Sequence, residues 1–257
     1  MSGHHDNCSS CPRFADCVAH RILGNGVISV SIKQLHFARG DNVRRDTVGT
    51  AGGLSVIKSG IALTCGYLEN GEMLPSCILG DGDVCGESAL LKHVFAPGHF
   101  IFLTDTELCV VDRKSIYWAM DNNKAAPKEL IATCLNSQGA QLRTIWILNG
   151  VHVIDRVGRL LSDLALKAAI KHTTDKQFCI TQDFIAAFIH AERATITRCL
   201  HKLQEQGYIE IGRRMITLTE KFLASDMYQN NPWLNTFAYS VKGKHPFKGT
   251  SKRPITC

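Results

Sequence analysis

Residues 180–219 constrain the fold of this 257-residue chain more than any other segment. Thr181 is a suitable N-cap for one helix, a short turn at residues 190–192 follows, and a second helix over residues 193–206 ends at Gly207. Two short β-type runs joined by a Gly-Arg-Arg turn come next, Tyr208–Ile211 and Met215–Leu218. A helix, a turn, a second helix and a hairpin with a basic tip predict a winged helix-turn-helix.

The second of these helices carries residue types that can contact DNA. In a helix-turn-helix the N-terminal part of the second helix enters the major groove, where arginine can bind guanine and threonine can bond a base or a phosphate. The candidate DNA contacts on this helix and on the hairpin tip are Arg193, Thr195, Thr197, Arg198, Lys202, Arg213 and Arg214. The alternative is a small helical subdomain with a solvated basic face, and the order of the elements favours DNA binding.

Short β-type runs separated by glycine-containing turns occupy the stretch from about Val27 to Val111. Turn signals such as Glu69-Asn70-Gly71 lie between them. The expected strands are Val27–Ile32, Leu54–Ile57, Ile61–Tyr67, Met73–Leu79, Phe100–Leu103 and Leu108–Val111. Many short strands at regular spacing predict a small antiparallel barrel or jelly roll.

A heptad-spaced row of side chains follows the strand region. Its apolar members are Ile131, Leu135, Leu142 and Ile145, and Gln138 and Asn149 are its polar members. Because a 3.5-residue period suits packing against a partner helix, we expect a homodimer seam here. A helix packed on its own barrel is the alternative that the spacing leaves open. A second helix, over residues 152–172, has one apolar face.

The net charge of +6 is confined to the C-terminal third of the chain. Residues 1–175 are balanced at 17 basic and 17 acidic side chains, whereas residues 176–221 carry an excess of two basic residues and residues 222–257 an excess of four. Placed this way, the charge suggests a polyanionic partner. The tail from Tyr228 to Cys257 would either add phosphate contacts or form a solvated tail.

Three of the eleven cysteines, Cys8, Cys11 and Cys17, follow a C-x2-C-x5-C pattern near the N-terminus. Thiolates this close can take three corners of an iron–sulfur cube, and a [4Fe–4S] cluster needs four ligands. Three alternatives remain open: a zinc site that also uses nearby histidines, a disulfide or thiol switch, and three unrelated surface cysteines.

Two segments resemble the Crp/Fnr family of bacterial transcription regulators. The stretch ITQDFIAAFIHAERATITRCL, with its continuation LQEQGYI up to Ile209, resembles the DNA-binding motif of that family. The stretch GDGDVCGESAL, which contains Gly86 and Glu87, resembles the glycine-bracketed turn of its effector-domain barrel. The resemblance covers about residues 25–222. It implies a homodimer in which each chain has a β-roll, a long dimerisation helix and a winged helix-turn-helix.

The N-terminal cysteine pattern is similar to that of the oxygen-sensing Fnr-type members of this family. In those proteins a remote cysteine in the last barrel strand, just before the dimerisation helix, is the fourth ligand, and Cys109 occupies that place. The resemblance therefore implies a [4Fe–4S] cluster bound by Cys8, Cys11, Cys17 and Cys109. Cyclic-nucleotide binding is disfavoured, because residues 92–100 lack the arginine that nucleotide-sensing members use to neutralise the buried phosphate.

Two departures from the family pattern concern DNA recognition. His190 stands in the turn where the family usually has glycine, and Ala194 stands where many members place a base-reading glutamate. The resemblance implies a palindromic promoter site of the TTGAT–ATCAA kind as double-stranded DNA partner, with its inner bases left open by Ala194. It also implies RNA polymerase as a protein partner.

We therefore expect an oxygen- or redox-responsive DNA-binding regulator of α+β fold class, active as a homodimer. Its expected parts are a cysteine-rich arm (1–25), a β-roll sensor domain (26–112), a dimerisation helix (113–150), a winged helix-turn-helix domain (151–222) and a basic tail (223–257). In this hypothesis oxygen attacks the cluster, the seam loosens and the DNA-binding form is lost.

Other functional classes have less support in the sequence. No apolar run approaches the ~18 residues of a membrane helix, and the first residues contain no apolar stretch of signal-peptide type, so we expect a cytoplasmic protein without membrane contact. The alternative from a different class is a small iron–sulfur or thiol oxidoreductase. It lacks a nucleotide-binding glycine loop, a Ser/His/Asp arrangement and paired catalytic carboxylates, so we expect no enzyme.

Overall fold

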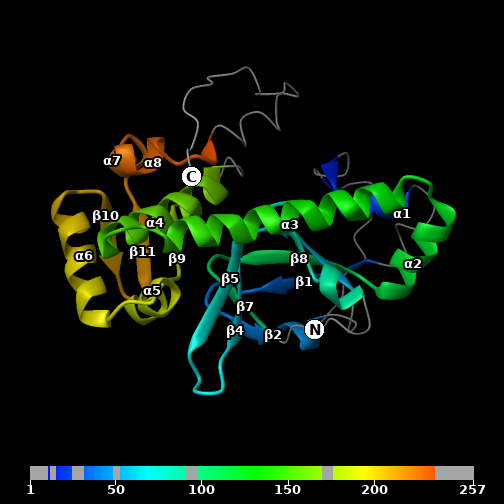
Figure 1. Cartoon of the computed structure of the whole chain (residues 1–257), viewed down its shortest axis with the longest axis horizontal. Coiled ribbons are helices and arrows are strands. Elements are labelled where there is room, and N and C mark those ends of the chain that lie inside the picture. Colours follow the sequence, from blue (N-terminus) through cyan, green and yellow to red (C-terminus); the bar gives the residue numbers. More distant parts are fainter. Residues whose placement is uncertain are drawn as a thin grey trace, which may run out of the picture.

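The structure is a computed structural model that describes residues 11, 16–24, 32–48, 53–90, 98–169 and 176–234. Two β-sheets form a roll, the long helix α3 (Ala126–Leu148) lies across it, and a largely helical domain follows at the far end of α3 (Figure 1). The short helices α1 (Val18–Leu23) and α2 (Arg113–Asn122) pack at the opposite end of α3. This arrangement confirms the expected α+β fold class.

The roll consists of two four-stranded antiparallel sheets. The first has the order β1 (Ile32–Phe37), β8 (Thr106–Val111), β3 (Leu54–Ser59) and β6 (Val84–Cys85). The second has the order β2 (Asn42–Arg44), β7 (His99–Phe102), β4 (Ala62–Tyr67) and β5 (Met73–Leu79). The described strand begins at Ile32 and continues past the expected end of Val27–Ile32 as far as Phe37, and residues 25–31 lie outside the described part of the chain.

Aromatic side chains fill the interior of the roll. The rings of Phe37 and Phe102 stack with centroids 4.3 Å apart and planes 6° from parallel, and the ring of Phe100 lies 5.8 Å from that of Phe102. All three side chains are buried. This core holds the two sheets together and fixes the positions of the loops at either end of the roll.

The helical stretch after the roll is two helices rather than the single helix expected over residues 113–150. Asp112 caps α2, because its Oδ1 accepts a hydrogen bond from the Ser115 amide at 3.0 Å. The chain leaves the helix at Asn123, whose side-chain amide donates to the carbonyl oxygens of Arg21 and Ile22. This bond ties the break between α2 and α3 to α1, the only described helix of the N-terminal arm.

The C-terminal domain has the winged helix-turn-helix geometry that the sequence predicts. Its helices are α4 (Val153–Ala169), α5 (Gln182–Ile189), α6 (Arg193–Glu205), α7 (Glu220–Leu223) and α8 (Asp226–Gln229). Its three-stranded sheet has the order β10 (Ile209–Gly212), β11 (Met215–Leu218) and β9 (Gln177–Phe178). The buried faces of α4, α5 and α6 share one apolar core with this sheet.

The packed domain continues beyond the expected boundary at residue 222. Tyr228 on α8 is 7% exposed and belongs to the core of the winged domain. The hydroxyl of Ser162 on α4 donates to the Met227 carbonyl at 2.7 Å. Residues 223–234 are therefore part of the domain rather than of a solvated tail, because they cover apolar surface on α4. The rest of the expected tail lies outside the described residues.

None of the helices in the described part of the chain combines the length and the apolar character that a membrane-spanning helix requires.

Candidate DNA-binding and sensor sites

The helix-turn-helix presents one polar face of α6 to solvent. Thr181 caps α5 as predicted, since its hydroxyl oxygen accepts from the Phe184 amide at 3.1 Å. On α6, Ile196, Leu200 and Leu203 are fully buried against the domain core. The residues that α6 exposes on its other side include Arg193, Ala194, Arg198 and Lys202.

Hydrogen bonds order several of the predicted DNA contacts before any DNA is bound. The Arg198 guanidinium donates to the Thr195 hydroxyl at 3.0 Å, so the arginine lies along its own helix. The Thr197 hydroxyl donates to Oε1 of Gln182 at 2.7 Å, which joins α6 to the first turn of α5. Thr197 therefore has a structural role between the two helices. The contact role of Gln182 was not predicted from the sequence. Its position directly after the Thr181 cap, in the first turn of α5, is the feature that could have indicated it.

The hairpin between β10 and β11 carries the two remaining predicted arginines at its tip. Gly212 pairs with Met215, so Arg213 and Arg214 are the two residues of a tight turn, and both are exposed. Arg214, the second central residue of this turn, has φ 59°, in the left-handed region. The basic tip thus projects from the same domain as α6.

The sensor half of the molecule gathers three predicted cysteine ligands around one pocket. Cys11, Cys17 and Cys109 line it, together with residues of α1, β3 and the β5–β6 turn. Cys17 is the residue before α1, and Cys109 is on β8 with 9% exposure. The fourth predicted ligand, Cys8, lies outside the described residues. Within the described ranges no three His, Cys, Asp or Glu side chains are close enough together to hold one metal ion.

A half-buried cation, Lys58, lines this pocket. Lys58 on β3 donates to Oε2 of Glu107 at 2.9 Å and to Oε1 of Gln34 at 3.2 Å. Partial burial lowers the pKa of the Lys58 ammonium. The hydrogen bond and charge of Glu107, with smaller contributions from Cys109 and Cys11, outweigh that effect and raise its pKa overall. A nearby positive charge favours the thiolate form of a cysteine, which is the form that binds metals. Sequence reasoning missed Lys58, because only the paired strands bring it to Cys109.

Glu87, in the glycine-bracketed turn, points toward α3. Burial raises the pKa of its carboxyl, and a hydrogen bond with the Ser137 side chain opposes that rise. The charge of Arg45 acts on the same carboxyl, and the Arg45 guanidinium lies 5.8 Å from the centre of the Phe100 ring. Arg45 lies outside residues 92–100, where the sequence pattern places the arginine of nucleotide-sensing members, and the fold brings its charge to Glu87 from the 3-10 helix Arg45–Thr47.

The heptad row on α3 is exposed in the single chain. Ile131 and Leu135 are 62% and 61% exposed, and Leu142 and Ile145 are each 54% exposed. The opposite side of the helix is buried against the roll and the winged domain, for example at Ala140 and Ile147. Four large apolar side chains in one row on one helix form a surface of the kind that binds a second protein.

Two family models match the chain in succession. A cyclic nucleotide-binding domain matches residues 34–123, and a Crp-like helix-turn-helix domain matches residues 155–222. The first match covers most of the roll and α2, and the second covers α4 to α7 with the recognition helix and the wing. A search of curated proteins found no match.

Solved structures with the same fold come from several bacteria. A transcriptional regulator of the Crp/Fnr family from Eubacterium rectale is 19% identical, with a TM-score of 0.60 over 85% of this chain and 98% of that one. A CRP-family regulator from Thermus thermophilus is 17% identical, with a TM-score of 0.59 over 75% and 98%. The c-di-GMP-responsive global regulator of Xanthomonas campestris is 20% identical, with a TM-score of 0.57 over 78% and 97%. At these identities the likeness shows the fold.

The cyclic nucleotide-binding match lies over the roll, and the Crp-like helix-turn-helix match lies over the winged domain. The exposed face of α6 carries Arg193, Arg198 and Lys202, whose positive charges suit DNA. No part of this assignment calls for an enzyme active site. The chain belongs to the Crp/Fnr family and is a DNA-binding transcription regulator.

Proposed function

We propose that this regulator senses oxygen through a [4Fe–4S] cluster bound by Cys8, Cys11, Cys17 and Cys109. The observation that supports the proposal is that Cys109 of β8 lines the same pocket as the two described cysteines of the N-terminal arm, although more than ninety residues separate them in the sequence. Cys8 is three residues from Cys11 in the sequence, a separation that suits two ligands of one cluster.

The residues around the pocket suit thiolate ligands. The Lys58 ammonium supplies a nearby positive charge, and Ile32, Val56 and Ala19 supply an apolar wall. Hydrogen bonds, charge and burial around the sulfur atoms are the main means by which a protein tunes such a site. When bound, the cluster would supply an oxygen-sensitive link between the N-terminal arm and β8.

The arm is attached to the elements that present the dimer seam. α1 begins directly after Cys17 and packs against both α2 and α3. Arg21 of α1 donates to Glu129 near the start of α3 at 2.8 Å, two residues before Ile131 of the seam. A change in the position of α1 would therefore shift the start of α3, which carries the first residues of the seam, and would alter dimer formation.

A homodimer formed through the exposed row on α3 would place two recognition helices on one DNA duplex. Two-fold symmetry then requires a palindromic site with half-sites about 34 Å apart, one turn of B-DNA. The side chains on α6 expected to read bases are Arg193 and Arg198, and the wing arginines suit phosphates. RNA polymerase bound next to such a promoter site would be the protein partner.

Iron content after anaerobic purification tests the cluster. We expect about four irons per chain and visible absorbance that air bleaches. Cys109→Ala and Cys11→Ala should each abolish iron retention. Cys199→Ala, on the half-buried side of α6, is the matched control and should retain iron. A colourless protein with one zinc ion would contradict the cluster, and an iron-retaining Cys109→Ala variant would exclude Cys109 as a ligand.

Binding to a palindromic promoter fragment tests the interface. Arg198→Ala should weaken anaerobic binding by about 1–3 kcal/mol, because it removes a base contact. Arg39→Ala, on an exposed turn of the roll, is the control and should leave the affinity unchanged. Equal affinities of Arg198→Ala and wild type would show that the DNA contact lies outside this face of α6.

A further inference from the structure

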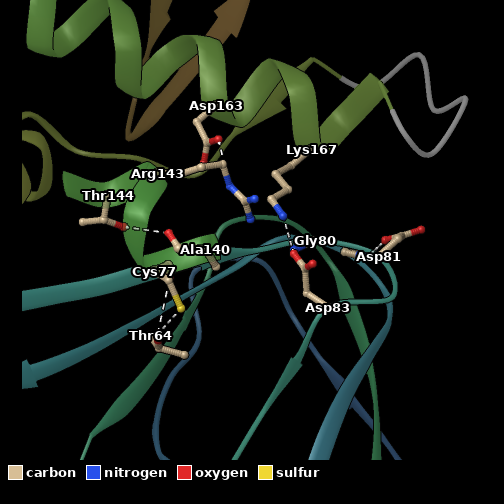
Figure 2. Close-up of polar contacts among 11 residues, drawn as sticks. Thr64, Cys77, Gly80, Asp81, Asp83, Ala140, Arg143, Thr144, Asp163 and Lys167 are labelled. Carbon is tan, nitrogen blue, oxygen red and sulfur yellow. Dashed lines mark hydrogen bonds and ion pairs between the residues drawn. The ribbon is translucent and has the colours of Figure 1, made fainter. Parts of the chain in front are cut away.

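Four ionisable residues of alternating sign meet where the roll, α3 and α4 join (Figure 2). They are Asp83 in the β5–β6 turn, Arg143 on α3, and Asp163 and Lys167 on α4. The Lys167 side chain is 1% exposed, that of Asp163 2% and that of Arg143 8%. These residues come from three parts of the chain that the sequence pattern treats as separate.

Two ion pairs join α4 of the winged domain to its neighbours, one to the roll and one to α3. The Lys167 ammonium donates to Oδ2 of Asp83, and Nε of Arg143 lies 3.5 Å from Oδ1 of Asp163. Asp163 and Lys167 are one helical turn apart on α4, so they face the same side. Burial raises the pKa of the Asp163 carboxyl, and the charges of Lys167 and Arg143 oppose that rise.

The β5–β6 turn fits closely around Lys167. Oδ2 of Asp83 also accepts from the Gly80 amide at 2.7 Å, which closes the turn. A Cβ at Gly80 would come within 2.8 Å of the Lys167 side chain, so glycine lets the lysine stem lie against the turn backbone. A movement of this turn would therefore move the partner of Lys167.

The same turn borders the cysteine pocket. Gly82 lines that pocket together with Cys11, Cys17 and Cys109. Across the sheet, Val56 of β3 pairs with Cys109 on one side and with Val84 on the other. Cys109, Val56 and Val84 are thus paired side by side across three strands, and Val84 directly follows Asp83 in the chain. The Asp83 carboxylate in turn contacts Lys167 of α4.

We propose that the Asp83–Lys167 pair couples the cysteine pocket to the orientation of the DNA-binding domain. The inference rests on the proposed sensing role of those cysteines. Apolar contacts also join the two domains, for example through Leu63 and Ile78 of the roll and Phe178 of the winged domain, but such contacts are not directional. The Lys167 side chain of this ion pair is 1% exposed and the Asp83 side chain 28% exposed, so a displacement of Asp83 would leave the buried Lys167 ammonium without its charged partner. The pair is thus the contact that transmits a shift of the turn to α4.

The central variant is the double substitution Asp83→Asn with Lys167→Met. It removes both charges together, while asparagine can still accept from the Gly80 amide and methionine retains an apolar stem. Lys167→Arg preserves the positive charge and is the conservative rescue. Lys176→Met with Glu220→Gln removes an ion pair that lies within the winged domain and serves as the matched control.

The first measurement is the ratio of DNA affinities before and after exposure to air. Wild type, Lys167→Arg and the Lys176/Glu220 control should show a loss of at least about tenfold on exposure. In the Asp83/Lys167 double variant the two affinities should agree within about twofold. A double variant that binds DNA anaerobically and still loses affinity as wild type does would overturn the coupling. If that variant fails to fold, Gly80→Ala, which displaces Lys167 without changing charge, should reduce the ratio at least threefold.

A second measurement needs no cluster. Coupling is reciprocal, so a saturating concentration of DNA should change the alkylation rate of Cys109 in the iron-free wild-type protein by several-fold, as followed by peptide mass spectrometry. In the double variant the change should be less than about twofold. No change in wild type would overturn the coupling. If the anaerobically purified protein contains no iron but DNA still changes the alkylation rate of Cys109, the cluster is contradicted and the coupling is supported.

Discussion

His190 adopts a left-handed conformation, with φ 52° and ψ 60°, at the C-terminal end of α5. Its amide donates to the Ala186 carbonyl, so this residue ends the helix in the position where glycine is favoured. A side chain with a Cβ is strained there, and His190 is exposed, so no packing compensates for the strain. The turn between the two DNA-binding helices is therefore locally less stable than it would be with glycine.

His190→Gly should raise the free energy of unfolding by about 0.5–1 kcal/mol, since relief of strain exceeds the added chain entropy. Urea unfolding of the purified protein measures the change. His201→Gly is the control: this exposed residue lies inside α6, where glycine should cost about 1 kcal/mol. Destabilisation by both substitutions would mean that His190 makes a favourable contact in the turn.

Glu87 predicts a pH dependence of stability. Its pKa is raised above the ordinary 4.5 by burial, so the folded protein retains a proton that the unfolded chain has already lost. The contribution of this group to stability is complete below pH 4.5 and is lost as pH rises through the folded pKa. Urea unfolding should show this slope in wild type and a flatter profile for Glu87→Gln. Identical pH profiles for the two proteins would exclude a role for the carboxyl.

At the scale of elements, the sequence predicted those helices and hairpins whose ends are determined locally. Thr181, Gly207 and the Gly-Arg-Arg turn mark their own boundaries, and the structure confirms the elements they bound. Residues 33–37 of β1 were not predicted as a strand, because the polar residues Lys33 and His36 interrupt the apolar pattern there. Strands as short as β2 and β6 have no readable period and form only through pairing with β7 and β3.

The candidate sites divide in the same way. Arg198 could be chosen as a candidate from its position in the helix-turn-helix, and Cys17 from the cysteine spacing together with the family resemblance. Lys58, Arg45 and Gln182 could not, because each acts through a contact with a residue distant in the sequence. The pairing of strands and the docking of helices, rather than any local pattern, bring them into place.

The exposed row on α3 predicts the oligomeric state. Leu142→Asp should convert a dimer to a monomer in anaerobic analytical ultracentrifugation, because a carboxylate would be buried without a partner at the seam. Gln141→Asp, on the adjacent exposed face of the same helix, is the control and should remain dimeric. A Leu142→Asp protein that sediments as a dimer would place the interface on another surface.

The helix α8 predicts a stability contribution from beyond residue 222. Tyr228→Ala should lower the free energy of unfolding by about 3–5 kcal/mol, since the ring is buried against Phe222 and α4. Urea unfolding tests it, and Tyr67→Ala, at the exposed end of β4, should change stability by less than about 1 kcal/mol. A small effect at both positions would separate α8 from the domain core.

At the scale of the whole molecule, one apolar cluster extends from the roll into the winged domain. It includes Ile61, Leu63 and Leu103 on the roll, and Leu160 and Phe178 in the winged domain. Because this cluster and the ion pairs of Figure 2 cross the same boundary, we expect the two domains to unfold as one cooperative unit in the absence of DNA.

Fluorescence of Trp146, at the end of α3, should therefore report the same urea midpoint as far-ultraviolet circular dichroism, in a protein whose other two tryptophans are replaced by phenylalanine. Two separated transitions would show that the domains unfold independently and that the shared core contributes little to the coupling between them.

The position of Asp163 and Lys167 determines where this regulator can be divided for engineering. α4 belongs to the winged domain by fold, yet two of its charged residues, Asp163 and Lys167, are buried where α4 meets the roll and α3. A hybrid that takes the winged domain of another regulator, α4 included, would leave Asp83 and Arg143 facing foreign side chains. A workable exchange retains the native α4 and joins the new sequence after it, so the practical boundary between interchangeable modules lies a full helix later than the domain boundary.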